Sequence, residues 1–249
     1  SNTDTLALIE IKDLNDNIKF SKLSYINNQQ IIGSDPWKNG LGFDTTVSIV
    51  LDESNFSSGL FFLETIPIIV KKKKNESTDL LVVLPTNTMT SYTVLGGKSF
   101  YKDLVSDGIR ADVLSFRRPY RKYSDGKGGE RLRVKPGVKW LYNQGYDINF
   151  ITDYDMDEPN YSINSNIIVI VGHSEFWTRK ARLNFDYHVD IGKNALILSG
   201  NTMWKQVRYE DNGNRIFSYY NSHPKNDNHP EGLTTGFSGS ESTSSYEYL

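Results

Sequence analysis

Cysteine is absent from this sequence of 249 residues. Without thiols the chain has no disulfide framework, no thiolate metal site and no cysteine nucleophile. No apolar run approaches the ~18–20 residues that a membrane-spanning helix needs. The first residues, 1–3, also lack the basic and apolar regions of a signal peptide. We therefore expect no membrane span, and neither a cytoplasmic nor a secreted location is favoured.

A large excess of charge of one sign is also missing. The formal net charge is -2 and the pI is near 6.1, so no overall field would attract DNA, RNA or an acidic membrane. Hydrophobic residues make up 37% and charged residues 23% of the chain, which is enough apolar material for a packed core. The composition predicts a globular protein that does not bind nucleic acid.

The chain is long enough for two domains. In residues 1–73, short apolar segments alternate with clusters of Asn, Asp, Gly and Ser, a pattern typical of the strands of a small β-sandwich-like domain. The polar segment from Lys71 to Ser77 follows, and we interpret its lysine run as a solvated linker. The second predicted domain covers residues 78–249.

This second part has the pattern of an α/β domain. Leu80 to Leu84 form a continuous apolar run, as in a strand covered on both faces, and similar runs occur at 146–151, 167–171 and 195–198. Helical stretches between them predict a parallel sheet with helices on both faces. Ligands bind at the carboxyl ends of strands in such sheets, which directs attention to the loops there.

One of the predicted helices is defined by its apolar spacing. Between Trp177 and Gly192, the residues Trp177, Ala181, Phe185 and Val189 recur every four positions and are expected to form one buried stripe. Thr178 is in place to cap the helix, and Arg182 is expected on its outer face.

Three loops at predicted strand ends carry distinctive motifs. The first contains PTNT at 85–88, SY at 91–92 and GGKSFY at 96–101, the second reads GHSEFW at 172–177, and the third reads SGNTMW at 199–204. In this order the three blocks resemble the C-terminal domain of the N,N-dimethylformamidase large (beta) subunit family. The resemblance implies a fold like that of class I glutamine amidotransferases, with a β-sandwich ahead of it.

The resemblance also implies a metal site. The amidase of this family holds a mononuclear iron (Fe) with two tyrosines and one glutamate, which match Tyr92, Tyr101 and Glu175 here. Tyr120 is an alternative to Tyr101, because the Tyr101 match requires a shorter intervening loop. Phenolate and carboxylate are hard oxygen donors, which suit trivalent iron.

Two further residues match neighbours of the iron in the family. His173 is expected to transfer a proton to the departing amine, and Asn201 to donate a hydrogen bond to the developing oxyanion. Structural interpretations stay open beside these. Glu175 is expected to begin a helix, where a carboxylate interacts favourably with the helix dipole. His173 could be a structural hydrogen-bonding residue at a strand end, and Asn201 could simply support a turn.

The expected function is therefore a metal-dependent hydrolase that cleaves a C–N bond of a small-molecule amide. A homo-oligomer or a separate small subunit is the expected partner. The alternative is a non-catalytic module on the same scaffold that binds carbohydrate or protein, which the β-rich first part would also suit. Metal content distinguishes the two hypotheses.

Other candidate sites are weaker. Ser174 lies at a strand-to-helix turn, but the second glycine of a Gly-x-Ser-x-Gly nucleophile motif is replaced by Phe176. The acidic residues of 153–158 lack the spacing and glycine of a calcium-binding EF-hand loop, which favours a solvated acidic loop. Residues 117–139 include nine Lys or Arg, and we interpret them as a mostly solvated surface.

Overall fold

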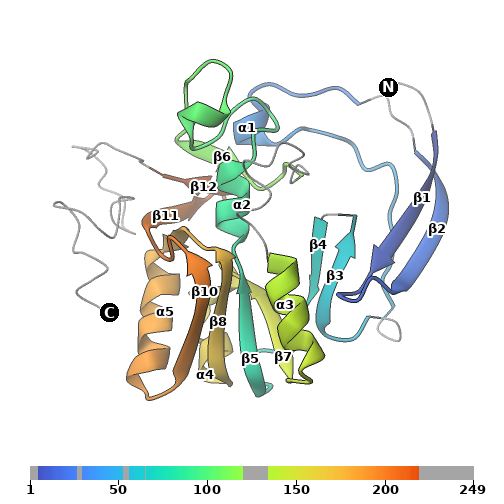
Figure 1. Ribbon diagram of the computed structural model, residues 1–249. Helices are drawn as coiled ribbons and strands as arrows, with labels where there is room; N and C mark the ends of the chain where they lie inside the picture. The colour runs from blue at the N-terminus through green and yellow to red at the C-terminus, as the bar shows by residue number, and fades with distance from the viewer. Residues whose placement is uncertain (1–4, 27–29, 53–55, 65, 120–133, 219–249) are drawn as a thin grey trace, which may run out of the picture.

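The computed structural model of the chain describes residues 5–26, 30–52, 56–64, 66–119 and 134–218 (Figure 1). The predicted residue Tyr120 and most of the basic segment 117–139 lie outside them. No helix in these ranges is long and apolar enough to cross a membrane.

A parallel sheet forms the centre of the α/β part, as predicted. Its strands are β5 (Thr78–Leu84), β7 (Ile148–Thr152), β8 (Ser165–His173) and β10 (Asn194–Gly200). Their order is β10-β8-β5-β7, and every pair is parallel. The apolar runs of β5, β7 and β8 are mostly buried because both of their faces are covered.

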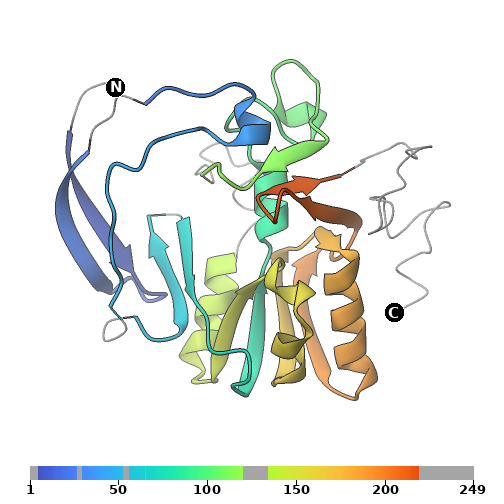
Figure 2. The same ribbon diagram turned by 180° about the vertical axis from the view of Figure 1, so that it is seen from behind.

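Helices cover both faces of this sheet. They are α3 (Val134–Asn143), α4 (Pro159–Ile163) and α5 (Arg179–Asp190). Val138 and Leu141 of α3 pack with Leu84 on one face, and Ala181 of α5 packs with Val83 on the other. Figures 1 and 2 show α3 in front of the sheet in one view, and α4 and α5 in front of it from behind. The core therefore has two layers, one on each side of the sheet.

Two details of the α5 prediction are wrong. Thr178 does cap the helix, since its Oγ1 accepts a hydrogen bond from the Ala181 backbone N–H at 3.0 Å. However, Val189 is 44% exposed, and Arg182 is buried and pairs with Asp186. A strict spacing of four residues drifts by about 40° per step around a helix of 3.6 residues per turn, so the stripe turns away from the core before Val189.

The strand β10 is also less buried than its apolar run predicts. It lies at the edge of the parallel sheet, and Leu196, Ile197 and Leu198 are 37–46% exposed in the described structure. An apolar run does not distinguish an inner strand from an edge strand.

The first part of the chain forms an antiparallel sheet of β1 (Thr5–Lys12), β2 (Ile18–Ile26), β3 (Gly59–Leu63) and β4 (Ile66–Val70), in the order β2-β1-β3-β4. These strands are the β-rich part expected from the sequence, but those described form one sheet, not the two of a sandwich. Between β2 and β3 the chain passes through α1 (Pro36–Asn39) beside β6, where Leu41 N donates to Arg117 O at 3.2 Å. The division into 1–73 and 78–249 stays a prediction.

A third, mixed sheet lies beyond the carboxyl ends of the parallel strands (Figure 1). It consists of β6 (Val113–Ser115), β12 (Arg215–Phe217), β11 (Lys205–Glu210) and β9 (Phe176–Thr178), in that order. The helix α2 (Thr86–Tyr92) continues directly from β5 toward it, and two short 3-10 helices, η1 (Lys102–Leu104) and η3 (Asp155–Asp157), lie in neighbouring loops. The loops that carry the sequence motifs therefore lie between two sheets.

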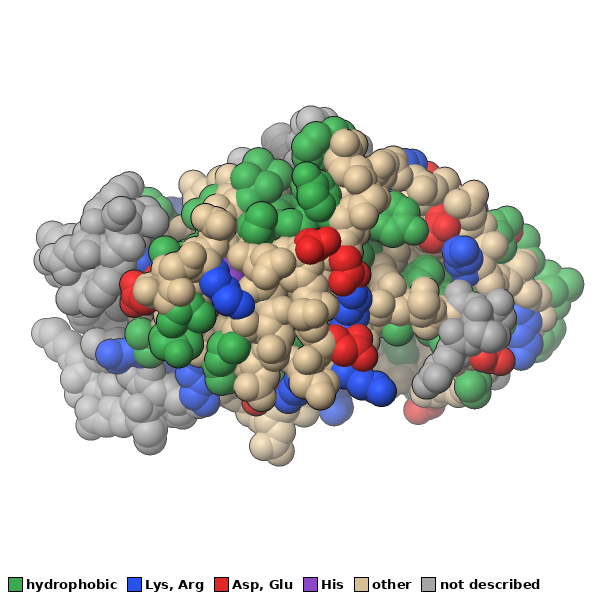
Figure 3. Space-filling model, turned by 90° about the horizontal axis from the view of Figure 1, so that it is seen from below, with side chains coloured by type: hydrophobic (Ala, Val, Ile, Leu, Met, Phe, Trp, Pro, Cys, Tyr) green, Lys and Arg blue, Asp and Glu red, His purple; other side chains and the backbone are tan. Residues whose placement is uncertain are grey.

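The lysine run before β5 is bound to the α/β part instead of forming a free linker. Lys71 pairs with Asp155, Lys72 with Asp147 and Lys74 with Glu158. The Lys72 side chain is only 14% exposed. Figure 3 shows cationic and anionic side chains next to one another on the face seen from below, so this face carries no patch of one sign.

Candidate functional site

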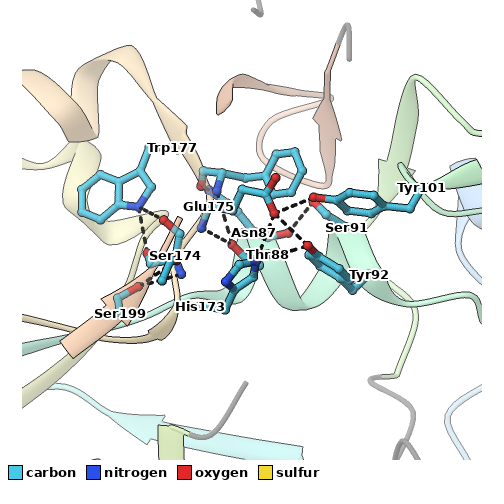
Figure 4. Close-up of polar contacts among 12 residues, drawn as sticks. Asn87, Thr88, Ser91, Tyr92, Tyr101, His173, Ser174, Glu175, Trp177 and Ser199 are labelled. Carbon is cyan, nitrogen blue, oxygen red and sulfur yellow. Dashed lines mark hydrogen bonds and ion pairs between the residues drawn. The ribbon is translucent and has the colours of Figure 1, made fainter. Parts of the chain in front are cut away.

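Four predicted residues meet at the carboxyl edge of the parallel sheet (Figure 4). Tyr92 Oη donates to Glu175 Oε2 at 2.9 Å, and Tyr101 Oη donates to the same oxygen at 2.5 Å. His173 Nε2 lies 3.2 Å from Glu175 Oε2 and 3.2 Å from Tyr92 Oη. The oxygen atoms of Tyr92, Tyr101 and Glu175 and the Nε2 of His173 therefore lie close together.

The Glu175 side is positioned by the end of β8. Gly172 has φ +76°, a left-handed conformation that glycine adopts without strain, and the chain turns there from the sheet into the loop. The Thr88 Oγ1 on α2 then accepts hydrogen bonds from the backbone N–H groups of Glu175, at 2.9 Å, and Phe176, at 3.3 Å. The helix that carries Tyr92 therefore also fixes the backbone of Glu175.

Ser174 is held in place by its neighbours and is not exposed as a nucleophile. Its hydroxyl accepts a hydrogen bond from Trp177 Nε1 at 2.8 Å, and its backbone N–H donates to Ser199 Oγ at 3.0 Å. The residue is completely buried. It links the second and third motif loops.

The tyrosine side is positioned by a loop folded back on α2. The rings of Tyr92 and Tyr101 stack with centroids 4.3 Å apart and an interplanar angle of 29°. Gly96, in the motif between them, has φ +91°, and a Cβ there would lie 2.9 Å from Trp37 N in α1. A larger residue at 96 would therefore push this loop away from α1.

Arg118 holds the same loop in place through hydrogen bonds. Its guanidinium donates to the carbonyl oxygens of Thr90, Thr93, Leu95, Lys98 and Ser115 at 2.9–3.2 Å. The residue is only 4% exposed, so the prediction of a solvated surface is wrong for this member of the basic segment. The five carbonyl oxygens, two of them at the end of α2, supply partial negative charge that compensates the buried guanidinium.

The electrostatics of the site follow from its burial. Glu175 is 3% exposed. Burial, and then the negative charge of Glu175, raise the pKa of Tyr101 well above its usual range, so this phenol is protonated and donates to the carboxylate. Burial lowers the pKa of the Lys205 amine, and the negative charge of Glu175 partly offsets this shift.

The donor set fits a hard metal ion. Two phenols and a carboxylate supply oxygen ligands, and such ligands prefer hard cations to soft ones. The described residues contain no group of three or more His, Cys, Asp or Glu side chains that could hold a metal. Any ion at this edge would therefore depend on Tyr92 and Tyr101 as well as Glu175.

Comparison with known families identifies the family of this chain. The sequence model of the family described as "N,N-dimethylformamidase beta subunit-like, C-terminal" matches residues 34–244, which is most of the chain. The chain belongs to this family. No curated protein sequence matches it.

One residue predicted from the N,N-dimethylformamidase beta subunit-like family does not join the cluster. Asn201 directly follows Gly200, which pairs with His173 between β10 and β8. Its side chain is exposed and makes no hydrogen bond to the other four residues, all of which are described. Its φ of +48° and the bond from Trp204 N to its carbonyl, at 3.2 Å, are those of a turn residue.

A buried polar network beside the site was missed by the sequence analysis. Asp153, at the end of β7, accepts hydrogen bonds from Thr86 Oγ1 at 2.5 Å and from Asn87 N at 3.0 Å. Asn87 Nδ2 in turn donates to Phe176 O at 3.1 Å and to Tyr209 Oη at 2.8 Å. The network joins β7, α2, β9 and β11, and so supports both halves of the site.

The acidic loop 153–158 is therefore not uniformly solvated. Asp153 is completely buried, and Asp155 accepts from Thr152 N at 3.0 Å. Asp157 accepts from Thr178 Oγ1, and Glu158 pairs with Lys74. Each carboxylate has its own partner, and the loop has no common point for calcium.

Asp153 is expected to make stability depend on pH. Burial raises the pKa of Asp153 to about 8. A carboxyl with a raised pKa in the folded state contributes stability below its unfolded pKa, and this contribution is lost as the pH rises toward 8. The loss is at most about 1.4 kcal/mol per pH unit.

In urea unfolding, Asp153→Asn should therefore be more destabilising at pH 5 than at pH 8. The exposed Asp190→Asn should show no such trend, and a pH-independent difference at Asp153 would contradict this account.

Proposed function

We propose that this chain carries the active site of a metal-dependent hydrolase that cleaves the C–N bond of an amide. The convergence of Tyr92, Tyr101 and His173 on Glu175 Oε2 is the observation that carries the proposal. Membership of the N,N-dimethylformamidase beta subunit-like family supports the reaction class. The class I glutamine amidotransferase-like form of the α/β fold belongs to the same proposal.

In this proposal Tyr92, Tyr101 and Glu175 hold one iron ion. When bound, the ion would supply the positive charge that polarises an amide carbonyl and lowers the pKa of a water molecule. The three residues come from two chain segments that Thr88 and Arg118 already hold in place, so the ligands are positioned before any ion arrives. Tyr92 and Glu175 are buried, which keeps competing water away from their oxygen atoms.

His173 and Asn201 have proposed roles on the substrate. His173 Nε2 lies beside the phenol and the carboxylate and is 12% exposed, so it can accept a proton there and pass it to the departing amine nitrogen. Asn201 lies at the same sheet edge with an exposed amide, which is available to donate to a substrate oxygen.

A second subunit also belongs to this proposal. The family description refers to a beta subunit, which supports assembly with another chain or with further copies of this one. The apolar side chains exposed on β10 are a surface that such assembly could cover.

The metal is tested by elemental analysis and a visible spectrum of protein purified without added metal. We expect iron in equal amount to protein and a charge-transfer colour from phenolate bound to ferric iron. Tyr92→Phe should lose both, because Phe offers no oxygen ligand, whereas Tyr142→Phe on α3, whose side chain is 43% exposed, should keep both. A folded wild-type protein that is colourless and free of iron would overturn the proposal and favour the non-catalytic binding module.

A further inference from the structure

A cavity of about 310 Å³ lies between the first sheet, α3 and the start of α2. The described residues that line it are Leu60, Phe62, Glu64, Pro67, Leu84, Met89, Val134 and Lys135. Six of the eight are apolar. The two charged residues do not place a charge inside the cavity. Glu64 is exposed, and Lys135 pairs with Asp16 at 2.5 Å. We call this space the α3-side cavity.

The α3-side cavity lies on the same side of the parallel sheet as His173. Side chains alternate between the two faces of a strand. Val171 of β8 packs in the same core cluster as Leu84, on the α3 side, and Leu198 of β10 pairs with it. Gly200, two residues after Leu198, therefore faces the same side, and a Cβ there would lie 3.6 Å from His173 Nδ1. Val83 pairs with Ile170, so Leu84 is level with Val171. Leu84, which forms one wall of the cavity, is therefore about two residues before His173 along the direction of the strands.

The helix α2 also connects the cavity to the site. Met89 lines the cavity, and Tyr92 is three residues later on the same helix. Side chains three positions apart lie next to each other on a helix surface. Tyr92 Oη reaches both His173 and Glu175, so one helix face borders the cavity at one end and the reacting groups at the other.

We propose that the α3-side cavity holds an uncharged hydrocarbon arm of the amide substrate, while its C–N bond lies at His173 and Glu175. This inference rests on the proposed function and deepens it, because it sets the substrate class. An apolar cavity of ~150 Å³ is enough for benzene. About twice that volume fits an arm of roughly the size of a hexyl chain or a substituted ring. The substrate would then be considerably larger than a dimethylated formamide.

Binding of two amide series tests the proposal. N-alkylformamides and alkanamides with arms from methyl to octyl are titrated into the iron-loaded full chain by calorimetry, and their hydrolysis is followed separately. In at least one series, affinity should rise about fourfold per added methylene until the cavity is full. Val134→Phe, which fills the cavity from the first residue of α3, should stop this rise at a shorter arm.

Two further variants complete the test. Val189→Phe, the same substitution on α5 across the sheet, should leave the dependence on arm length unchanged. Phe62→Leu, which enlarges the cavity, should extend the rise to longer arms, so the test does not depend on one variant folding.

The outcomes separate this inference from the proposed function. Affinity that rises with arm length and is blunted in Val134→Phe, without any hydrolysis, would support the cavity and overturn the amidase. Hydrolysis of a short amide with no gain from longer arms in either series would overturn the cavity and leave the amidase standing. An arm-length dependence that Val134→Phe and Phe62→Leu both leave unchanged would also overturn the cavity.

Discussion

Replacing Glu175 with alanine is expected to abolish iron binding and amide hydrolysis together. Glu175 Oε2 is the single atom that accepts from both Tyr92 and Tyr101, at 2.9 and 2.5 Å. Its loss removes one ligand and leaves the two phenols without the acceptor that orients them. The rate should fall by more than the ~10²–10³-fold that a single lost hydrogen-bond donor costs in an active site.

The measurement is kcat/KM for an amide together with iron content by elemental analysis. Glu158→Ala is the matched control, because that carboxylate is 55% exposed and pairs with Lys74 on the surface. It should keep both iron and activity. A circular dichroism spectrum like that of the unmodified protein shows that the Glu175→Ala chain is folded. Undiminished hydrolysis by a folded Glu175→Ala protein would remove the basis of the proposed reaction.

The largest effect on stability is expected from Arg118→Met. The variant leaves the carbonyl groups of Thr90, Thr93, Leu95, Lys98 and Ser115 without the buried guanidinium that they bind. A buried carbonyl group left without its hydrogen bond costs about 1–3 kcal/mol, so we expect a total loss of roughly 3–5 kcal/mol. For a chain of this size, that corresponds to a fall in Tm of roughly 6–20 °C. Iron affinity should fall as well, because the loop between Tyr92 and Tyr101 is no longer held.

Arg117→Met tests whether burial is the cause. Arg117 is the neighbouring residue, is exposed, and donates to Asn214 Oδ1 at 3.2 Å. Exposed pairs contribute up to about 1 kcal/mol, so this variant should lose little stability in urea unfolding. Equal losses in the two variants would mean that the guanidinium of Arg118 has no special structural role.

The parallel sheet and α5 could be predicted because their signals are local. Leu80 to Leu84 form a continuous apolar run, and Thr178 precedes an apolar stripe, so neither prediction needs knowledge of the rest of the chain. The sheet β6-β12-β11-β9 could not be predicted in this way. Two of its strands, β6 at one edge and β12 beside it, have three residues each and pair across about a hundred residues of chain. Such pairing depends on the assembled fold.

The candidate site was predicted in its residue types but not in its supports. The motif blocks contain Tyr92, Tyr101, His173 and Glu175, and the structure brings these four together. Their supports depend on burial, which sequence patterns do not reveal for charged residues. Arg118 resembles its neighbour Arg117 in the sequence, yet Arg118 is buried and Arg117 is exposed.

The distances along the chain between the site residues affect the order in which the site can form. Tyr92 and Tyr101 are close in sequence and stack on each other, whereas Glu175 is 74 residues beyond Tyr101. A folding chain can therefore form the phenol pair with α2 alone, but gains the carboxylate only after β8 has paired with β5. An ion held by all three residues would link the Tyr92–Tyr101 segment to the end of β8, and would so stabilise the central sheet. Its binding free energy would then add to the resistance of the whole domain to unfolding.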